Sequence, residues 1–237
     1  MEDAASALVR MMGVFARGAD GGWAREVEGV TAMVTGFPDP MLNAVLAVTR
    51  SGAESELLAE VARTGLPYCL ETRTPDPVDE MVAVATVPVM VLDSPALLST
   101  GNLSIRALGP EEIGLHLDCL ATSVGVDRSY FAALEGGGLL RQEGVTAYLA
   151  TVDDEPVATG VGIRSGEFVG IFNMGTPEKH RRQGFGAAVA SRIVLDGFAH
   201  GAAGAVLQAS PLGRGIYERL GFSRMELWTV WLPLRQT

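Results

Sequence analysis

The sequence predicts a mixed α/β fold, of the α+β kind, in which a mostly antiparallel sheet is flanked by helices. Two strand-like runs, at 146–153 and 156–165, meet at a turn with the sequence Asp-Asp-Glu-Pro, which is typical of an antiparallel pair. A third run, at 167–174, leads into a glycine-rich loop and an amphipathic segment, which indicates a strand–helix–strand unit. A chain of 237 residues, 48% of them hydrophobic, can bury the core that such a sheet requires.

The elements before this meander follow from local patterns. A strand is expected at 103–109, where apolar residues recur with a period of two, and a helix at 110–125, which begins with a proline and two acidic residues. A second helix is expected at about 127–134, followed by a loop with three consecutive glycines. One strand and two helices therefore precede the meander.

After the glycine-rich loop and its helix, the segment 205–222 predicts a strand followed by a short helix. Ser210 and Pro211 suit the N-cap and the first position of that helix, and Gly221 stands where a C-terminal cap is expected. A last strand is expected from Phe222 onward, in a run rich in β-branched and aromatic residues.

The first half of the chain predicts a shorter version of the same order, strand–strand–helix–strand–helix–strand. The segments that predict these elements are, in order, 29–38, 42–49, 54–65, 67–73, 76–85 and 88–93. A stretch rich in Ser, Pro, Thr, Gly and Asn at 92–102 separates them from the second half. We therefore expect two units, 1–98 and 99–237.

Composition and charge argue against several functional classes for this protein. A net charge of −10 opposes general nucleic-acid binding, which needs a basic face. No apolar run reaches the roughly 18 residues of a membrane span, and the first residues lack the pattern of a secretory signal, so we expect a cytoplasmic protein that binds neither nucleic acid nor membrane. Cys69 and Cys119 are far apart and lack neighbouring ligands, which predicts neither a metal site nor a disulfide.

The loop before the long second-half helix carries the clearest chemical pattern. Gly184 and Gly186 have no Cβ, so a ligand can approach the backbone closely, and Arg181 and Arg182 precede a helix start whose N–H groups are unpaired. This combination favours an anion, above all a phosphate. An exposed basic helix start without a ligand is the alternative. The chain has no Gly-Lys pair for a nucleotide-triphosphate loop, and Val189 replaces the Gly or Ala of a dinucleotide-binding pattern.

The pattern R-x-x-G-x-G, formed here by Arg181, Gly184 and Gly186, resembles that of the GNAT family of acyl-CoA-dependent N-acetyltransferases. Its surroundings are similar too: a strand-like run at 167–176 precedes it, and 205–222 resembles the family's next strand, short helix, tyrosine and Leu-Gly-Phe. The resemblance implies a GNAT-like fold in the second half and a degenerate copy, without a second cofactor site, in the first. That copy would shape the acceptor pocket or would be a purely structural extension.

The resemblance also implies where acetyl-CoA, the family's co-substrate, would bind. In the family, the strand before the loop splays from its neighbour, and the pantetheine arm lies in the gap. The residues implied as cofactor-binding are Asn173, Met174, Gly175 and Thr176 on this strand, Arg181, Arg182, Gln183, Gly184, Phe185, Gly186 and Ala187 in the loop and helix start, and Ser210 across the gap. Backbone N–H groups from Gln183 to Ala187 would hold the pyrophosphate. No metal is expected.

Tyr217 is the implied catalytic residue, because a tyrosine at this place in the family lies near the acyl-CoA sulfur and can protonate the leaving thiolate. Many relatives also carry a carboxylate in the middle of the strand before the loop as a general base, but residues 169–172 here are Val-Gly-Ile-Phe. The remaining candidates for the base, none of them assigned, are Glu167, Asp153, Asp154 and His180.

These features together predict an N-acetyltransferase that moves an acetyl group from acetyl-CoA to a primary amine of a small molecule or a protein. A non-catalytic acyl-CoA-binding sensor or partner-recruiting module is the alternative, which the missing carboxylate favours and Tyr217 opposes. A Rossmann-type oxidoreductase would need a parallel sheet, which the strand pair at 146–165 opposes. Trp228 and Trp231 are expected on opposite faces of the last strand, in the core or in a homodimer contact.

Overall fold

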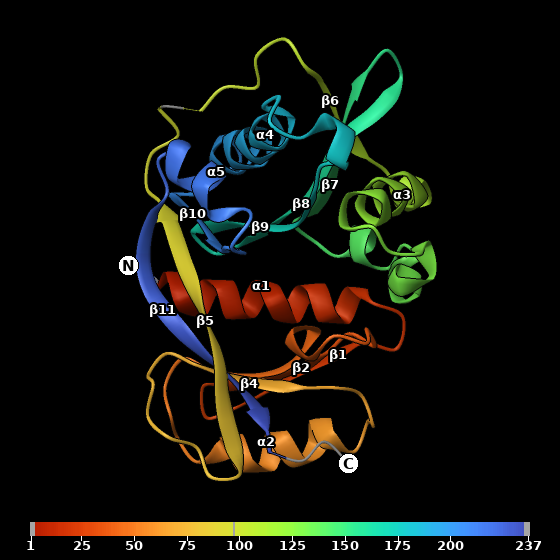
Figure 1. Ribbon diagram of the computed structural model, residues 1–237. Helices are drawn as coiled ribbons and strands as arrows, with labels where there is room; N and C mark the ends of the chain where they lie inside the picture. Colours follow the sequence, from red (N-terminus) through yellow and green to blue (C-terminus); the bar gives the residue numbers. More distant parts are fainter. Residues whose placement is uncertain (1–2, 97, 235–237) are drawn as a thin grey trace.

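The computed structural model describes residues 3–96 and 98–234, and within them eleven strands form one continuous sheet (Figure 1). The strands follow the order β1-β2-β3-β4-β11-β5-β10-β9-β8-β7-β6. In the described part of the sheet only the neighbours β3–β4 and β9–β10 are parallel. The predicted fold class, a mixed α/β fold with a mostly antiparallel sheet flanked by helices, is confirmed.

Each half of the chain forms an antiparallel meander that leads into a helix and a strand parallel to the last meander strand. The first half contains α1 (Ala4–Gly18), β1 (Trp23–Val27), β2 (Val30–Val34), a 3-10 helix (Pro40–Leu42), β3 (Asn43–Ala47), α2 (Ala53–Ala62), β4 (Cys69–Thr72) and β5 (Met81–Leu92). The second half contains β6 (Ser104–Leu108), α3 (Ile113–Val124), a 3-10 helix (Arg128–Leu134), β7 (Val145–Val152), β8 (Glu155–Ser165), β9 (Phe168–Gly175), α4 (Phe185–Ala199), β10 (Gly204–Gln208), α5 (Arg214–Arg219) and β11 (Ser223–Pro233).

The two halves exchange strands in the middle of the sheet. β11, from the second half, lies between β4 and β5 of the first half, and β5 lies between β11 and β10. β5 pairs with β11 from Met81 to Val91, whereas β10 pairs only with the last part of β5, from Val89 to Leu92. The pairing of β11 with β4 and β5 shows that strands of both halves complete the same part of the sheet. The division into the units 1–98 and 99–237 stays a prediction.

Two features of the first half differ from the sequence predictions. The segment 76–85, expected to be a helix, instead contains the beginning of β5, because Met81 to Val87 is rich in β-branched residues and pairs with β11. The predicted element order is therefore wrong at this point. α1 and β1, which precede the first predicted strand, were not predicted.

The predicted elements of the second half are confirmed, with two changes in helix geometry. The segment expected as a second helix forms the 3-10 helix Arg128–Leu134. The helix expected to begin after Ser210 begins only at Arg214, so the cap positions predicted for Ser210 and Pro211 are wrong. Ser210 Oγ instead accepts the N–H of Gly213 at 3.1 Å, in a turn that precedes α5.

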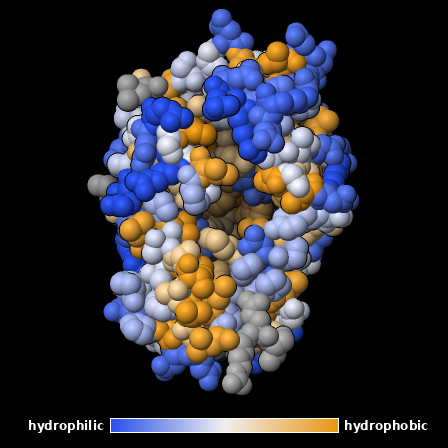
Figure 2. All heavy atoms as spheres, in the orientation of Figure 1, coloured by the Kyte–Doolittle hydropathy of each residue, from blue (hydrophilic) through white to orange (hydrophobic). Residues whose placement is uncertain are grey.

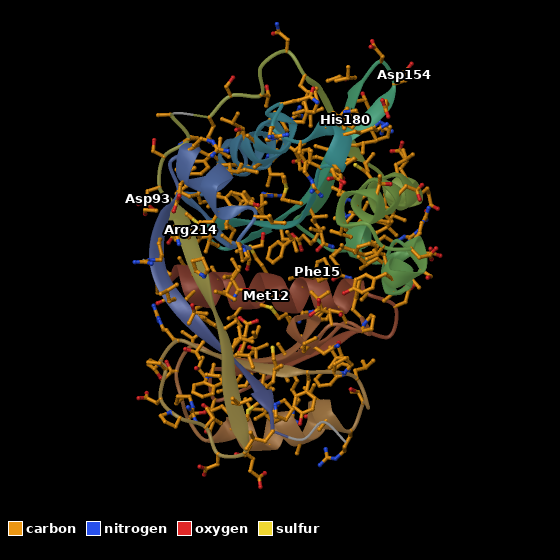
Figure 3. All side chains as sticks on the ribbon, viewed as in Figure 1. Met12, Phe15, Asp93, Asp154, His180 and Arg214 are labelled. Carbon is orange, nitrogen blue, oxygen red and sulfur yellow. The ribbon has the colours of Figure 1, made fainter. Side chains whose placement is uncertain are left out.

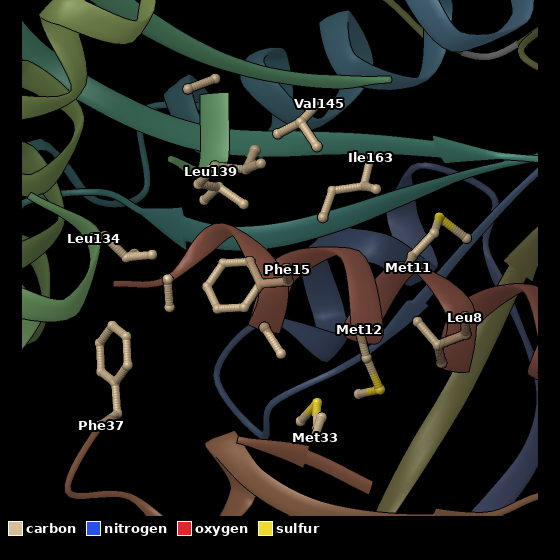
Figure 4. Close-up of a cluster of buried hydrophobic side chains, with 14 of the residues drawn as sticks. Leu8, Met11, Met12, Phe15, Met33, Phe37, Leu134, Leu139, Val145 and Ile163 are labelled. Carbon is tan, nitrogen blue, oxygen red and sulfur yellow. The ribbon is translucent and has the colours of Figure 1, made fainter. Parts of the chain in front are cut away.

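Helix α1 lies between the two lobes of the sheet (Figure 1). Eleven of its 15 residues are buried, and it contacts β1 and β2 on one side and β8, β9 and β10 on the other. Figure 4 shows Met12 directed toward Met33 of β2, and Met11 directed away from it. The other four residues, Ser6, Arg10, Val14 and Arg17, form one narrow, more exposed stripe along the helix. Its start is capped by Asp3, whose carboxylate accepts the N–H of Ser6 at 3.3 Å.

The two tryptophans of β11 lie on opposite faces of the sheet. Trp228 packs in the cluster that contains α1, and Trp231 packs in the cluster of β2, β3 and α2. Both are buried, with exposed fractions of 0% and 6%, so they are core residues. Cys69 and Cys119 are buried free thiols. Among the described residues no helix has the length and apolar character to cross a membrane, and no group of three or more potential ligands could hold a metal ion.

Candidate functional site

Strands β9 and β10 start as neighbours and then part. Their pairing ends at Gly170 and Val206, whereas β9 continues to Gly175 and β10 to Gln208. Beyond Gly170, the edge of β9 that faces β10 is therefore not paired with it. The backbone N–H and C=O groups on this edge can bind another molecule. This is the gap that the sequence resemblance implied.

A bulge in β9 lies beside this gap. Asn173 and Met174 together oppose the single residue Gly160 on β8, and Asn173 has a φ of +45°, in the left-handed region. A Cβ at Gly160 would collide with Sδ of Met174, so the glycine leaves room for this side chain. Bulges of this kind redirect side chains and backbone groups, and here they do so at the edge of the gap.

A cavity of about 460 Å³, which we call the loop cavity, lies beside the loop between β9 and α4. Ten of the twelve residues expected to bind a cofactor line it: Met174, Gly175, Thr176, Arg181, Arg182, Gly184, Phe185, Gly186, Ala187 and Ser210. Asn173 lines a neighbouring cavity instead. The Gln183 side chain lines neither cavity, because its Nε2 turns back to donate to the carbonyl of Lys179 at 3.2 Å.

The start of α4 gives the loop cavity its anion-binding character. Its N-cap is Gly184, with a φ of +88° that favours glycine, and no side chain caps the helix. The first backbone bond of the helix runs from Ala188 N–H to the Gly184 carbonyl. The N–H groups before it have no partner inside the helix, and the helix dipole adds a partial positive charge.

Three arginines line the loop cavity in two different ways. Arg181 donates to the carbonyls of Thr176, at 3.2 Å, and Ser123, at 2.6 Å, and so ties the loop to the end of β9 and to α3. Arg182 and Arg219 are exposed and form no hydrogen bond or ion pair with another described residue. Their guanidinium groups can therefore turn toward an anion. Arg219 was missed by the sequence analysis, because nothing in its local sequence places it beside the loop.

A second cavity, of about 300 Å³, lies between α1 and the separated ends of β9 and β10, and we call it the α1 cavity. Figure 2 shows a hollow near the middle of the molecule with hydrophobic walls. Its apolar residues come from both halves of the chain: Leu8, Met12, Phe15, Met33, Met41, Leu42, Ile171 and Phe172. The rings of Phe15 and Phe172 stack with centroids 6.2 Å apart. Its polar residues, apart from those shared with the loop cavity, are Asn173 and Gln208.

Three residues, Met174, Ser210 and Tyr217, line both cavities. Tyr217 is 8% exposed, and its ring packs edge-on against Phe222 with centroids 5.7 Å apart. Burial raises the pKa of its phenol to about 12, so the hydroxyl keeps its proton at neutral pH. The tyrosine therefore stands at the boundary between the cavities with a neutral, protonated hydroxyl group.

A buried carboxylate lies behind the α1 cavity. Glu71, on β4, is fully buried, and its Oε2 accepts a hydrogen bond of 2.6 Å from Nε2 of Gln208. Its Oε1 has no partner among the described residues. Burial raises the pKa of the Glu71 carboxyl to about 7, although the bond from Gln208 works against this shift. Glu71 was not among the predicted site residues, although an acid within a predicted strand was a signal in the sequence.

None of the base candidates from the sequence lines the α1 cavity. Asp153 and Asp154 form the turn between β7 and β8, and Figure 3 shows Asp154 at the tip of this hairpin, away from Met12 and Phe15. Glu167 precedes β9 at the end opposite to the gap. His180 lines the loop cavity, where its Nε2 lies 3.5 Å from the Glu155 carboxylate.

The structure is similar to that of a GCN5-related N-acetyltransferase from Kribbella flavida, with 20% sequence identity and a TM-score of 0.64 over 97% of this chain and 93% of that chain. A protein of the GNAT family from Novosphingobium aromaticivorans is 14% identical, with a TM-score of 0.61 over 94% and 98% of the two chains. A conserved protein of unknown function from Staphylococcus epidermidis is also 14% identical, with a TM-score of 0.62 over 88% and 92%. No family model and no curated protein sequence matches the chain.

The chain has the GNAT fold. The resemblance inferred from the R-x-x-G-x-G loop is thus confirmed for the fold. Because the Kribbella and Novosphingobium proteins match more than nine-tenths of this chain and of their own length, the first half is part of the shared architecture. In this GNAT fold, α1 and β2 of the first half form one wall of the α1 cavity.

Proposed function

We propose that the protein is an N-acetyltransferase that uses acetyl-CoA and a primary amine. The observation that supports this most directly is the meeting of the loop cavity and the α1 cavity at Met174, Ser210 and Tyr217, where β9 and β10 part. One cavity has an anion-binding helix start, and the other is a mainly apolar chamber on the far side of the gap. Two substrates can approach each other from these two sides within one complex.

The loop cavity suits acetyl-CoA as the donor substrate. Its pyrophosphate would accept hydrogen bonds from the backbone N–H groups between Gln183 and Ala187, and Arg182 and Arg219, which line the same cavity, would add positive charge. The backbone from Asn173 to Thr176, which β10 does not pair, would bind the amides of the pantetheine arm. Ser210, on the opposite side of the gap, offers a hydroxyl to the same arm.

The proposed chemistry needs a nucleophile, a place for negative charge and a proton for the leaving group. The amine nitrogen attacks the thioester carbonyl carbon, so that a C–N bond forms and the C–S bond breaks. Backbone N–H groups in the bulge at Asn173 and Met174 would stabilise the charge on the carbonyl oxygen. Tyr217 would donate its proton to the departing sulfur and regain a proton from solvent. The amine nitrogen would lose its own proton to solvent, so that protons balance.

The acceptor amine would lie in the α1 cavity, since this cavity reaches Tyr217 from the side opposite to the loop. The proposal that the first half shapes the acceptor pocket is supported by Leu8, Met12 and Met33, which line that cavity. Cytoplasmic location, absence of nucleic-acid binding and a possible homodimer stay predictions.

Thermal melting with acetyl-CoA, CoA and NADH tests the donor site. A ligand that binds only the native state raises the melting temperature, so acetyl-CoA and CoA should raise it and NADH should not. Release of the CoA thiol, measured with and without added amines, then tests transfer. Binding without amine-dependent release would favour the non-catalytic acyl-CoA sensor, and absence of binding would contradict both readings.

A further inference from the structure

The lining of the α1 cavity is divided into an apolar wall and a polar end. α1, β2 and the 3-10 helix Pro40–Leu42 contribute only leucine, methionine and phenylalanine. Asn173, Gln208, Ser210 and Tyr217 come from β9, β10 and the turn and helix that follow it, on the side shared with the loop cavity. None of the described residues that line the cavity is charged.

At the polar end, a hydrogen bond fixes the orientation of the Gln208 side-chain amide. Nε2 of Gln208 donates to the buried Glu71 carboxylate at 2.6 Å, which leaves the amide oxygen of Gln208 as the atom that can accept a hydrogen bond from a ligand. The Glu71 carboxyl lies behind this oxygen, and its Oε1 is buried without a partner among the described residues. A ligand nitrogen with N–H groups is therefore favoured at this end, and a ligand carboxylate is disfavoured.

The apolar wall restricts the rest of the ligand. Leu8, Phe15 and Met33 have exposed fractions of 1%, 4% and 2%, so a charged group placed against them loses its water without gaining a partner. The volume of about 300 Å³ lies at the low end of small-molecule sites. An aliphatic chain or one aromatic ring matches both the size and the character of this wall.

We infer that the acceptor is a small primary amine with an uncharged aliphatic or aromatic body, whose nitrogen lies at Gln208 and whose body lies against α1. This inference rests on the proposed function and specifies its acceptor. It distinguishes such amines from two related classes. Amino acids would bring a carboxylate toward Glu71, and polyamines would bring a second ammonium group to the apolar wall.

Two matched pairs of amines test the inference. Hexylamine and 1,6-diaminohexane differ in one terminal ammonium group, and 2-phenylethylamine and phenylalanine differ in one carboxylate. With saturating acetyl-CoA, we expect kcat/KM to be at least tenfold higher for the first member of each pair. Calorimetry of the same amines with the CoA-saturated protein should give the same order of affinity, which provides a readout that does not depend on turnover.

A variant of the wall tests the position of the ligand's body. Met41 is half-buried at the 3-10 helix, so Met41→Glu should be tolerated and should shift the preference from hexylamine toward 1,6-diaminohexane by at least tenfold. Leu115→Glu is the matched control, because Leu115 is exposed on α3 and lines neither cavity. It should keep the original preference.

The possible failures are distinguishable. If acetyl-CoA does not bind, the proposed function is wrong. If acetyl-CoA binds but diamines or amino acids are preferred, or no amine binds to the CoA-saturated protein, this inference alone is overturned. If octanoyl-CoA is used better than acetyl-CoA with every amine, the α1 cavity holds the acyl chain, and the inference is also overturned.

Discussion

The side-chain amide of Gln208, on β10, donates a hydrogen bond of 2.6 Å to Glu71, on β4, although 137 residues separate them in the sequence. β11 and β5 lie between these two strands in the sheet. The bond thus connects the wall of the α1 cavity to a fully buried carboxyl group in the first half of the chain. Its consequences can be measured in stability as well as in activity.

Burial of Glu71 should make the protein less stable as the pH rises. The pKa of this carboxyl is about 7 in the folded state against an ordinary value of 4.5, so between these values the native state binds more protons than the unfolded state. The free energy of unfolding therefore falls as pH rises through this window. A shift of this size corresponds to about 3 kcal/mol above pH 7.

Glu71→Gln removes the ionisation and keeps the shape, so it should stabilise the protein by up to about 3 kcal/mol at pH 8 and by little at pH 4.5. Denaturant unfolding at both pH values measures this difference. Glu143→Gln, an exposed acid without a described partner, is the control and should have little effect at either pH. An equal gain for Glu71→Gln at both pH values would show that Glu71 is not the titrating group.

Arg182→Ala should weaken acetyl-CoA binding about fivefold, because it removes one exposed charge near the proposed pyrophosphate position. Arg63→Ala removes the same charge from an exposed position in the first half and should not change the affinity. Isothermal calorimetry measures both. Equal affinities for the two variants would remove Arg182 from the site.

Arg181→Ala should behave differently, since Arg181 donates to the backbone carbonyls of Thr176 and Ser123. Loss of these bonds releases the loop from β9 and α3, so we expect faster hydrogen exchange in residues 176–187 as well as weaker binding. Exchange measured by mass spectrometry separates this effect from a simple loss of charge. Unchanged exchange would make Arg181 a direct ligand of the donor substrate instead.

Tyr217→Phe should lower kcat by about ten- to a hundredfold, because it removes the proton donor and keeps the ring that packs against Phe222. The affinity for acetyl-CoA should hardly change, since the phosphate contacts lie elsewhere. Tyr68→Phe, a half-buried tyrosine that lines neither cavity, is the control. An unchanged kcat, with chemistry shown to be rate-limiting, would leave water as the proton donor.

Calorimetry should give one acetyl-CoA per chain, although α2 begins much as α4 does. The N-cap of α2 is Gly52, with a φ of +94°, but Glu54 already accepts the N–H of Gly52 at 2.7 Å and pairs with Arg50 at 2.8 Å. The chain's own carboxylate therefore occupies the place that a phosphate would need. A stoichiometry of two would contradict this explanation.

The second-half elements could be predicted because their signals are local. Asp153 and Asp154 in the turn, Gly184 in the loop and Gly221 after α5 each adopt a positive φ. The R-x-x-G-x-G pattern itself covers five of the residues that line the loop cavity. The strand exchange could not be predicted, because the pairing of β11 with β4 and β5 depends on packing between distant segments.

Two further predictions failed. α1 was missed although Ser6, Arg10 and Arg17 lie on one face of the helix and make its sequence amphipathic. β5 was partly interpreted as a helix, because Pro77 and the acids around it are typical of a helix start. The α1 cavity remained hidden for a related reason, since its walls combine α1, β2 and β9, and no short motif connects them.

The insertion of β11 between β4 and β5 also affects how the protein must be made. β11 follows every other described strand in the sequence, so the ribosome completes it only after both of its neighbours. Until Ser223–Pro233 is synthesised, the edges of β4 and β5 that pair with β11 have no partner strand. Unpaired strand edges readily pair with other chains. A chain interrupted before Ser223 should therefore aggregate, whereas a chain that includes β11 has both edges paired.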